Sequence, residues 1–432
     1  MLDVLQNRTF RALFGAQVAA LLGTGLLTVA LALLAYDLAG EGAALILGTI
    51  LTIKMVAYVG IAPLAGALAG RFPRRGLLVA LDLVRAAAAL AFPFVETVWQ
   101  AYAIVFVLQS ASAAFTPTFQ ATIPDVLPDE AQYTRALSLS RLAYDLENIA
   151  SPALAAALLL LLPGESLFLG TLAGFLISAA LIVRLQLPAP AGSADDAFAS
   201  RVTRGLEIYF RTPRLRGLLS LNLAAAAAGA MVLVNTIALV RTVLGRGEGD
   251  VALALAAFGV GSMAAALILP RLLDRVGDRP VMLGGAAGLT ACLAILGFLV
   301  AATGLSWFGL LVAWITLGLA YSSVLTPSGR LLRRSAAPMD RPALFAAQFA
   351  ASHACWLLTY PLAGWLMTSG GAVVAATGLA TLAALGLGLS IRLWPAGDPE
   401  VLVHDHPDLP PDHPHVKGGG PHAHPYVIDG LH

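Results

Sequence analysis

"GALAGRFPRR" (residues 66–75) and "PRLLDRVGDR" (residues 270–279) are two polar, arginine-containing segments that align at an offset of 204 residues. Each lies between two long apolar runs. A second pair, "FRALFGAQVAA" at 10–20 and "LRGLLSLNLAA" at 215–225, aligns in the same order at an offset of 205. A nearly constant offset over long distances predicts that the chain consists of two structurally related halves.

The composition is typical of a membrane protein. Hydrophobic residues make up 58% of the 432 residues and charged residues 12%, against about 25% charged residues in soluble domains. The net charge of +1 gives no support for a nucleic-acid partner. A spanning helix needs about 20 mostly apolar residues. Twelve such runs occur, at residues 12–36, 44–69, 77–95, 101–121, 136–162, 166–187, 215–240, 250–270, 280–302, 306–326, 342–368 and 371–394.

These runs predict an all-α integral membrane protein with twelve transmembrane helices in two six-helix halves. No strand is expected, and no nucleotide-binding motif follows one, so an enzyme is not expected. Between the halves, residues 194–210 are expected to form an amphipathic helix on the membrane, with Ser193 as its N-cap. The expected division is an N-terminal half at 1–187, a cytoplasmic linker at 188–214, a C-terminal half at 215–395 and a disordered histidine-rich tail at 396–432.

The basic residues predict the orientation. Of the 26 basic residues, 24 are arginines. With the N-terminus in the cytoplasm, 22 basic residues lie at or near the cytoplasmic side, and only Arg241 and Arg246 lie outside. This asymmetry satisfies the positive-inside rule, so both termini are expected in the cytoplasm.

Twelve spans in two repeats, with basic loops after the second and eighth, resemble the major facilitator superfamily. The motif of this family between helices two and three is Gly-x-x-x-Asp-Arg-x-Gly-Arg-Arg. In this chain Gly70 replaces the acidic residue and Pro73 replaces the second glycine. In the family, the motif helps to lock the cytoplasmic face in the outward-open state. The matching residues, which the resemblance implies form a cytoplasmic gate, are Gly66, Arg71, Arg74 and Arg75 in the first copy and Asp274, Arg275, Gly277 and Arg279 in the second.

Residues 121–155 resemble the loop and fifth helix of bacterial drug and siderophore exporters of the same superfamily. These exporters often carry Gly-Pro where this chain has Ser151-Pro152. The resemblance implies a secondary transporter in the bacterial inner (plasma) membrane that exports small amphipathic organic compounds by alternating access, in exchange for protons. The expected partners are the lipid bilayer, a small-molecule substrate and a coupling proton, with no required cofactor. The expected oligomeric state is a monomer.

Ionisable residues inside the expected spans are candidates for coupling, because a charge within the membrane is costly unless it is paired or hydrated. These candidates are Lys54 in the second span, Asp145 and Glu147 in the fifth, and His353 in the eleventh. Helices two and eleven pack together in the family, which implies that Lys54 and His353 can meet. A packing or ion-pair role is the alternative for each. Five polar residues are expected to line the substrate cavity: Gln17, Gln109, Asn222, Asn235 and Tyr321.

Two further charged pairs are expected to be structural. Asp82 and Arg85 are spaced i, i+3, and Arg141 and Asp145 are spaced i, i+4, so each pair lies on one helix face.

The tail carries seven of the eight histidines, six of them in His-x-His pairs. Imidazole is a good ligand for Ni, Zn and Cu, and similar tails occur in nickel exporters of this superfamily. A divalent-metal (Ni, Co or Zn) exporter with a metal-collecting tail is therefore one alternative function, and a non-transporting sensor on a transporter fold is another. A disordered tail with no specific role stays open. The candidate metal ligands are His404, His406, His413, His415, His422 and His424.

Overall fold

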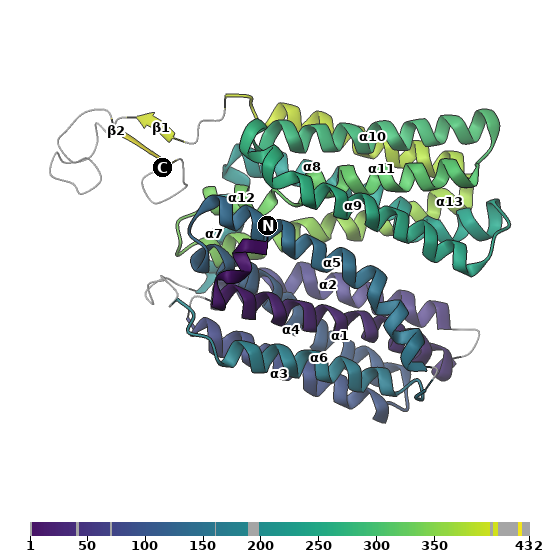
Figure 1. Cartoon of the computed structure of the whole chain (residues 1–432), viewed down its shortest axis with the longest axis horizontal. Coiled ribbons are helices and arrows are strands. Elements are labelled where there is room, and N and C mark those ends of the chain that lie inside the picture. The colour runs from purple at the N-terminus through teal and green to yellow at the C-terminus, as the bar shows by residue number, and fades with distance from the viewer. Residues whose placement is uncertain are drawn as a thin grey trace.

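The computed structural model describes residues 2–39, 43–69, 71–159, 161–188, 198–397, 401–404 and 422–425. Over these ranges the chain is helical, apart from two short strands in the tail. Figure 1 shows two lobes of roughly parallel helices, one from each half of the chain, lying side by side. The expectation of an all-α membrane fold is confirmed.

The N-terminal lobe has two apolar cores. One is built around Phe92 and Phe168, whose ring centroids are 4.8 Å apart. The other gathers Phe10, Phe115 and Tyr133 nearer one end of the lobe. The elements are η1 (Leu2–Gln6), α1 (Arg8–Ala39), α2 (Ala43–Ala69), α3 (Arg74–Ala91), η3 (Phe92–Phe94), α4 (Val98–Val126), α5 (Glu130–Leu159) and α6 (Ser166–Val183).

The C-terminal lobe has one large core, which includes Trp314, and a small second cluster around Leu269. The Trp314 indole Nε1 donates to Thr236 Oγ1 at 2.9 Å. The helices of this lobe approach closely because glycines face them. A Cβ at Gly261 would lie 1.9 Å from the Ile315 carbonyl oxygen, and one at Gly318 would lie 2.0 Å from that of Phe258. Such contacts are typical of membrane helices, which associate through small residues. The elements are α7 (Phe198–Arg211), α8 (Pro213–Ile237), η4 (Ala238–Val243), α9 (Glu248–Val276), α10 (Asp278–Thr303), α11 (Trp307–Leu325), α12 (Ser328–Arg334) and α13 (Arg341–Leu393).

Ten helical segments of the described residues are long and apolar enough to cross a membrane. Helix α13 contains two of the expected spans, because Gly371 (φ 72°, ψ −168°) interrupts its 53 residues. A straight helix of that length would measure about 80 Å, against about 30 Å of bilayer hydrocarbon. Helix α5 is not among the ten. It is present as expected, but it carries charged residues, and it packs against α1 in its own lobe and α9 in the other.

The linker differs from the expectation. Helix α7 begins at Phe198, and the expected cap at Ser193 lies outside the described residues. Its Ile208 and Tyr209 are fully buried. They pack on helix ends of the protein, so this apolar face lies against protein and not on the membrane.

The tail also differs from the expectation. Strands β1 (Val401–His404) and β2 (His422–Pro425) pair antiparallel, with His404 opposite His422. These two strands were not expected from the sequence, and disorder of the rest of the tail stays a prediction. The β-branched residues of "VLVH" favour an extended strand. The remaining tail histidines, His406, His413, His415 and His432, lie outside the described residues.

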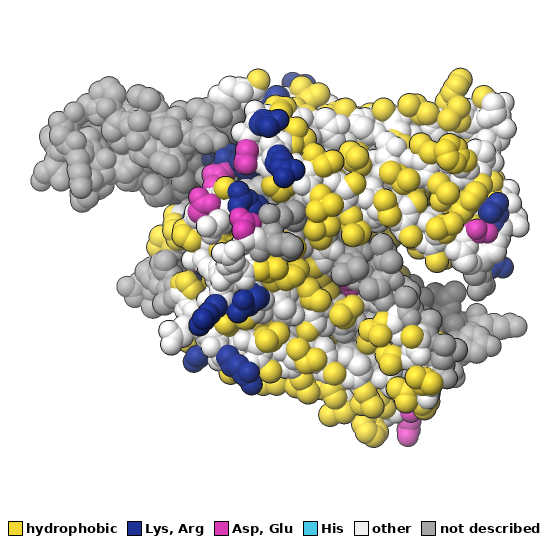
Figure 2. Space-filling model, in the orientation of Figure 1, with side chains coloured by type: hydrophobic (Ala, Val, Ile, Leu, Met, Phe, Trp, Pro, Cys, Tyr) yellow, Lys and Arg dark blue, Asp and Glu magenta, His cyan; other side chains and the backbone are white. Residues whose placement is uncertain are grey.

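The two ends of the bundle differ in charge. Arginines gather at the end where α7, α12 and the N-terminus lie, which we call the basic end (Figures 1 and 2). Between the ends, the surface is covered by exposed apolar side chains such as Phe106, Ile268 and Phe298. A continuous apolar belt of this kind is the surface that faces lipid. The arginines of the basic end include Arg71, Arg74, Arg75, Arg271, Arg275, Arg330, Arg333, Arg334 and Arg341.

Candidate functional site

Three of the four coupling candidates come together near the middle of their helices, between the two lobes. Lys54 lies on α2, Glu147 on α5 and His353 on α13, and the charge of Lys54 acts on both of the others. The Lys54 Nζ lies 5.6 Å from the centroid of the Tyr58 ring. The same ring meets the His353 imidazole edge-on at 4.8 Å. We call Lys54, Tyr58, Glu147 and His353 the central cluster. The side chain of the fourth candidate, Asp145, lies outside what the structure describes.

The carboxylate of Glu147 lies against α1 where that helix has no side chain. A Cβ added at Gly25 would come within 3.1 Å of Glu147 Oε1 and 2.1 Å of Ser151 Oγ. One helical turn before Glu147, Tyr144 interacts with Gln17 of α1. The Glu147 carboxylate is thus held within the membrane region, in contact with helices of its own lobe and within electrostatic range of Lys54.

His353 is oriented by its own helix. Its Nδ1 lies 2.7 Å from the Phe349 carbonyl oxygen, and its ring packs on the Phe349 ring at 4.1 Å. The Nδ1 atom is therefore the donor in this contact, and Nε2 is left as the basic nitrogen.

Arg141 links the lobes. Its Nε donates to Ser262 Oγ of α9 at 3.1 Å, and its guanidinium lies 4.9 Å over the Tyr321 ring of α11. The sequence indicated only a pair with Asp145 on the same helix. The structure therefore adds a cross-lobe contact to the candidate site, next to the predicted cavity residue Tyr321.

The other predicted cavity residues are buried in helix contacts. Gln17 Oε1 accepts a hydrogen bond from Ser140 Oγ at 3.0 Å, and Asn235 Nδ2 donates to the Ala363 carbonyl oxygen at 3.3 Å. Gln109 and Asn222 are 6% and 3% exposed. A role in lining the cavity stays a prediction for all of them.

A charged cluster at the basic end joins the lobes. Asp125, at the end of α4, forms an ion pair with Arg74 at the start of α3, and its Oδ1 lies 2.7 Å from Arg341 Nη1 at the start of α13. Arg74 and Arg341 belong to different halves, so Asp125 connects them. This contact is made although Gly70 replaces the acidic residue of the family motif.

A second charged cluster at the basic end repeats this pattern with the charges exchanged. Asp278 occupies the position 204 residues after Arg74. Its carboxylate lies 3.0 Å from Arg330 Nε and 2.9 Å from Arg334 Nη1, both on α12. Both arginines also pair with Glu130 of the other lobe, at the start of α5. Each half therefore contributes a three-helix ion cluster that reaches across to the other half.

The remaining residues of the motif have separate roles. Gly66 allows α2 to approach α13, since a Cβ there would lie 2.5 Å from Ala346 Cβ. Gly277 (φ 84°) ends α9 in a conformation that favours glycine.

Among the charged residues of the motif, the Arg279 Nε donates to the Trp394 carbonyl oxygen at 2.9 Å, at the end of α13. Asp274 lies 3.8 Å from Arg330. The exposed residues of the motif are Arg71, Arg75, Asp274 and Arg275.

Sequence reasoning missed the partners of the motif. In "IPDVLPDE", residues 123–130, Asp125 follows the first proline and Glu130 lies two residues after the second, so the sequence indicated that both lie near helix ends. Their partners Arg341 and Arg334 lie more than 200 residues away. Only the packing of the lobes brings these charges together.

Helix α7 packs across the basic end. Arg204 Nη2 lies 3.2 Å from Asp340 Oδ2, just before α13, and Gly205 lets α7 approach Ala343. The Tyr209 hydroxyl donates to Gln348 Oε1. Burial raises the pKa of the Tyr209 phenol well above its ordinary value, so the hydroxyl stays protonated as a donor. The linker helix is therefore fixed to the start of α13.

Asp82 and Arg85 form the ion pair that their spacing predicted. Both side chains are buried in the N-terminal lobe, and Ser178 Oγ donates to Asp82 Oδ2 at 2.7 Å. The Arg85 guanidinium lies between the Phe115 and Phe175 rings, 4.0 and 4.5 Å from their centroids. These partners all come from the same lobe.

The comparison with protein families defines the class of the protein. The profile described as Major Facilitator Superfamily matches residues 13–247 and 219–418. The chain therefore belongs to the major facilitator superfamily and is a multi-pass membrane protein with a transporter fold. Such a fold implies the lipid bilayer and a small-molecule substrate as partners.

Individual relatives are more distant. Macrolide efflux protein A of Streptococcus pyogenes is 24% identical over 218 residues, which cover 49% of this chain and 53% of that protein. An uncharacterised transporter of the superfamily, YfiS of Bacillus subtilis, is 27% identical over 158 residues, 35% of this chain and 38% of its own. The chain thus matches only about half of its curated relatives or less.

Solved structures show the same fold. The human organic anion transporter MFSD10 superposes with a TM-score of 0.74 at 14% identity, over 89% of this chain and 99% of that one. A bacterial homologue of the iron transporter ferroportin, in an outward-facing state, gives a TM-score of 0.73 at 15% identity over the same shares.

Proposed function

We propose that this protein is a secondary transporter that exports small amphipathic organic compounds in exchange for protons. It works by alternating access as a monomer in the bacterial inner membrane, with both termini in the cytoplasm and the basic end on the cytoplasmic side. It carries out no enzymatic reaction and requires no cofactor. The macrolide efflux proteins among its relatives support export of an amphipathic organic compound.

The observation that carries this proposal is the central cluster. A carboxylate and an imidazole lie within electrostatic range of one ammonium, between the two lobes and within the membrane region. In secondary transporters the substrate and coupling-ion sites lie near the midplane, at the interface of the repeats. When Glu147 binds a proton, it ceases to attract Lys54. Protonation can therefore change the balance between two arrangements of the lobes.

The contacts at the basic end support an outward-facing conformation. Asp125, Glu130 and Arg141 of the N-terminal half all reach residues of the C-terminal half, from the basic end up to the depth of the central cluster. In this conformation the substrate site is closed from the cytoplasm. The inward-facing state requires these ion pairs to separate.

A flux measurement tests the coupling. Purified protein in liposomes, with an imposed pH gradient, should move a labelled macrolide, and the flux should depend on the gradient. Glu147→Gln should fold and bind the compound but should lose the dependence on the gradient, because glutamine does not exchange a proton. Glu165→Gln is the matched control, since Glu165 is exposed at the start of α6 and lies outside the cluster.

Two outcomes would reject parts of the proposal, and a third would change the residue that carries the proton. A wild-type flux that does not change with the pH gradient would exclude proton coupling. If the flux of Glu147→Gln still depended on the pH gradient, proton exchange would be assigned to His353 instead. An absence of flux with every tested organic compound and metal ion would favour a non-transporting sensor.

The tail supports a second proposal, which is that it binds Ni, Zn or Cu ions. In the paired strands, His404 lies opposite His422, and His424 lies two residues further along the same strand. Directly opposite residues, and residues two apart, share one face of a hairpin. The backbone register therefore places three histidines at positions on one face of the paired strands. Imidazole is a good ligand of these ions.

Titration of the full-length protein with Ni or Zn tests this proposal. Binding should weaken below about pH 6, where imidazole becomes protonated. The double variant His404→Gln/His422→Gln should lose the tightest site, whereas His432→Gln, outside the His-x-His pairs, should not. Equal binding in the two variants, or none at millimolar metal, would end this proposal.

Export of metal is the weaker alternative. Among the described side chains, no group of three or more His, Cys, Asp and Glu residues could hold a metal ion. A metal-exporting protein truncated at residue 396 should keep part of its metal flux, because the tail would deliver ions to the spans. An exporter of organic compounds should keep all of its flux in metal-free buffer.

A further inference from the structure

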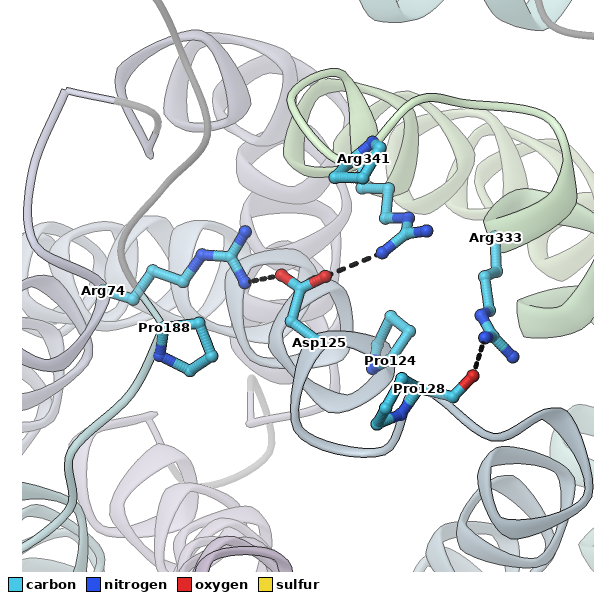
Figure 3. Close-up of a pocket in the computed structure, with 8 residues that line it drawn as sticks. Arg74, Pro124, Asp125, Pro128, Pro188, Arg333 and Arg341 are labelled. Carbon is cyan, nitrogen blue, oxygen red and sulfur yellow. Dashed lines mark hydrogen bonds and ion pairs between the residues drawn. The ribbon is translucent and has the colours of Figure 1, made fainter.

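A cavity of about 330 Å³ opens at the basic end, between the two lobes. Figure 3 shows the guanidinium groups of Arg74, Arg333 and Arg341 around it, with Asp125 at its centre. Arg74 is almost fully buried at its base, and Pro188 and Pro338 are exposed at its mouth. We call this cavity the arginine pocket. Its lining residues are Arg74, Pro124, Asp125, Pro128, Pro188, Arg333, Pro338 and Arg341.

The arginine pocket has an excess of positive charge. One carboxylate, Asp125, faces three arginines, and its two oxygens are already engaged by Arg74 and Arg341. Arg333 is placed differently. Its Nη2 donates to the Pro128 carbonyl oxygen, and its guanidinium lies 5.4 Å over the Tyr133 ring. Its charge is therefore held in the pocket by contacts with neutral groups.

Two donor atoms around the pocket are buried and unused. Arg333 Nη1 and Arg341 Nε are among the buried side-chain atoms of the described residues that have no hydrogen-bond partner. Buried polar groups in proteins are nearly always hydrogen-bonded, so an unused pair of this kind calls for an acceptor. The four prolines of the lining have no backbone N–H group, so the donors available to a ligand are mainly those of the arginines.

We propose that the arginine pocket binds a phosphate-bearing anion. Guanidinium groups bind phosphate oxygens through paired, charge-assisted hydrogen bonds, and two arginines here have N–H groups to spare. The volume lies at the lower end of the range for small-molecule pockets, about 300–1,000 Å³. It therefore fits a small organic phosphate or pyrophosphate, and also a phospholipid headgroup.

Binding of this anion stabilises the closed basic end. Arg333, Arg341 and Pro338 come from the C-terminal half, whereas Arg74 and Asp125 come from the N-terminal half and Pro188 begins the linker. Separation of the lobes divides the pocket, so the anion binds the conformation described above better than any conformation with the basic end open. A ligand with this preference shifts the equilibrium toward the closed state. The site is distinct from the central cluster and does not depend on the transported compound.

A thermal unfolding titration tests the proposal without any transport measurement. Full-length protein in nanodiscs of phosphatidylcholine is titrated with inorganic pyrophosphate, with sodium chloride at matched ionic strength as the blank. Pyrophosphate should raise the unfolding midpoint by about 2 °C or more at saturation. Arg333→Gln should weaken the apparent affinity roughly tenfold or more. Arg184→Gln, a change at an exposed arginine at the end of α6 outside the pocket, should leave the affinity unchanged.

Two further arms separate the possible sources of phosphate and guard against a folding defect. Nanodiscs containing phosphatidylglycerol, without pyrophosphate, test a lipid headgroup. A midpoint shift in this arm, lost in Arg333→Gln, would assign the site to lipid, whereas a shift with pyrophosphate alone would assign it to a soluble phosphate. Pro338→Glu places a carboxylate at the mouth of the pocket and should abolish either shift without removing an ion pair. Shifts that survive both substitutions, or no shift in either arm, would overturn the proposal.

Discussion

A charged side chain can be buried in this protein where ion-pair and hydrogen-bond partners satisfy it, and Asp82 is the clearest case. Its carboxylate is fully buried and is satisfied by Arg85 and Ser178, while two aromatic rings cover Arg85. Removing one partner of a buried ion pair leaves the other charge in an apolar surrounding. Removing both partners together leaves no charge to compensate.

This argument gives a prediction for the residue scale. Asp82→Asn should lower the free energy of unfolding by about 3–5 kcal/mol. The double variant Asp82→Leu/Arg85→Met should recover most of this loss. Denaturant unfolding in mixed micelles measures both. Asp250→Asn, which breaks a partly exposed pair with Arg246 at 3.2 Å, should cost only about 0–1 kcal/mol. A double variant as unstable as the single one would contradict this account of Asp82.

At the scale of elements, close contacts between helices control how the lobes meet. Helix α2 approaches the start of α13 at Gly66, and α12 approaches α5 at Gly329, where a Cβ would lie 2.8 Å from both the Tyr133 hydroxyl and Leu137 Cδ2. Helix α7 lies across the same region through Gly205. The basic end is therefore closed by tight helix packing as well as by charge.

Gly66→Ala should loosen the basic end. Its new methyl group would overlap Ala346, and α2 and α13 must move apart to make room. A reporter cysteine at Leu137, in a protein with Cys292 and Cys355 replaced by alanine, should then react faster with a permeant maleimide. Gly60→Ala on the same helix is the control, because no atom lies within 4 Å of its Cβ position. Equal labelling rates in the two variants would show that this contact does not limit opening.

At the scale of the whole molecule, the two halves close the basic end with equivalent helices and opposite charges. Arg74 and Asp278 are equivalent by the repeat. Arg74 binds Asp125 at the end of α4 and Asp278 binds Arg334 of α12, and both of these partners also contact the other half. The acidic and basic positions are exchanged between the two ion clusters, and each cluster attracts one half of the protein to the other. Both clusters are present although Gly70 replaces the acidic residue of the first motif.

The orientation of the whole chain is testable in cells. In a cysteine-free background, Gly247→Cys should react with an impermeant maleimide added outside, and Gly76→Cys should not. Both positions are exposed and uncrowded, but Gly76 lies at the basic end and Gly247 at the opposite end. Permeabilised cells should label both. Labelling of position 76 in intact cells would reverse the orientation proposed for the chain.

Much of the candidate site could be named from the sequence, but its connections could not. Lys54, Glu147 and His353 stood out because ionisable groups are rare in apolar spans. The pairing of Lys54 with His353 was expected only from the family arrangement of helices two and eleven. That Arg141 contacts Ser262 and Tyr321 depends on the packing of α5 against α9 and α11, which no local pattern encodes.

The sequence by itself determined the spans, the two halves and the asymmetry of basic charge. Within a bilayer each helix must satisfy its own backbone, so composition and length identify the spans directly. The tertiary structure alone decided which charges meet. Asp125 with Arg341, Glu130 with Arg334, and the arginine pocket between them all join residues from opposite halves. Side chains so far apart in the chain are brought together by the fit of packed helix surfaces, which depends on the whole molecule.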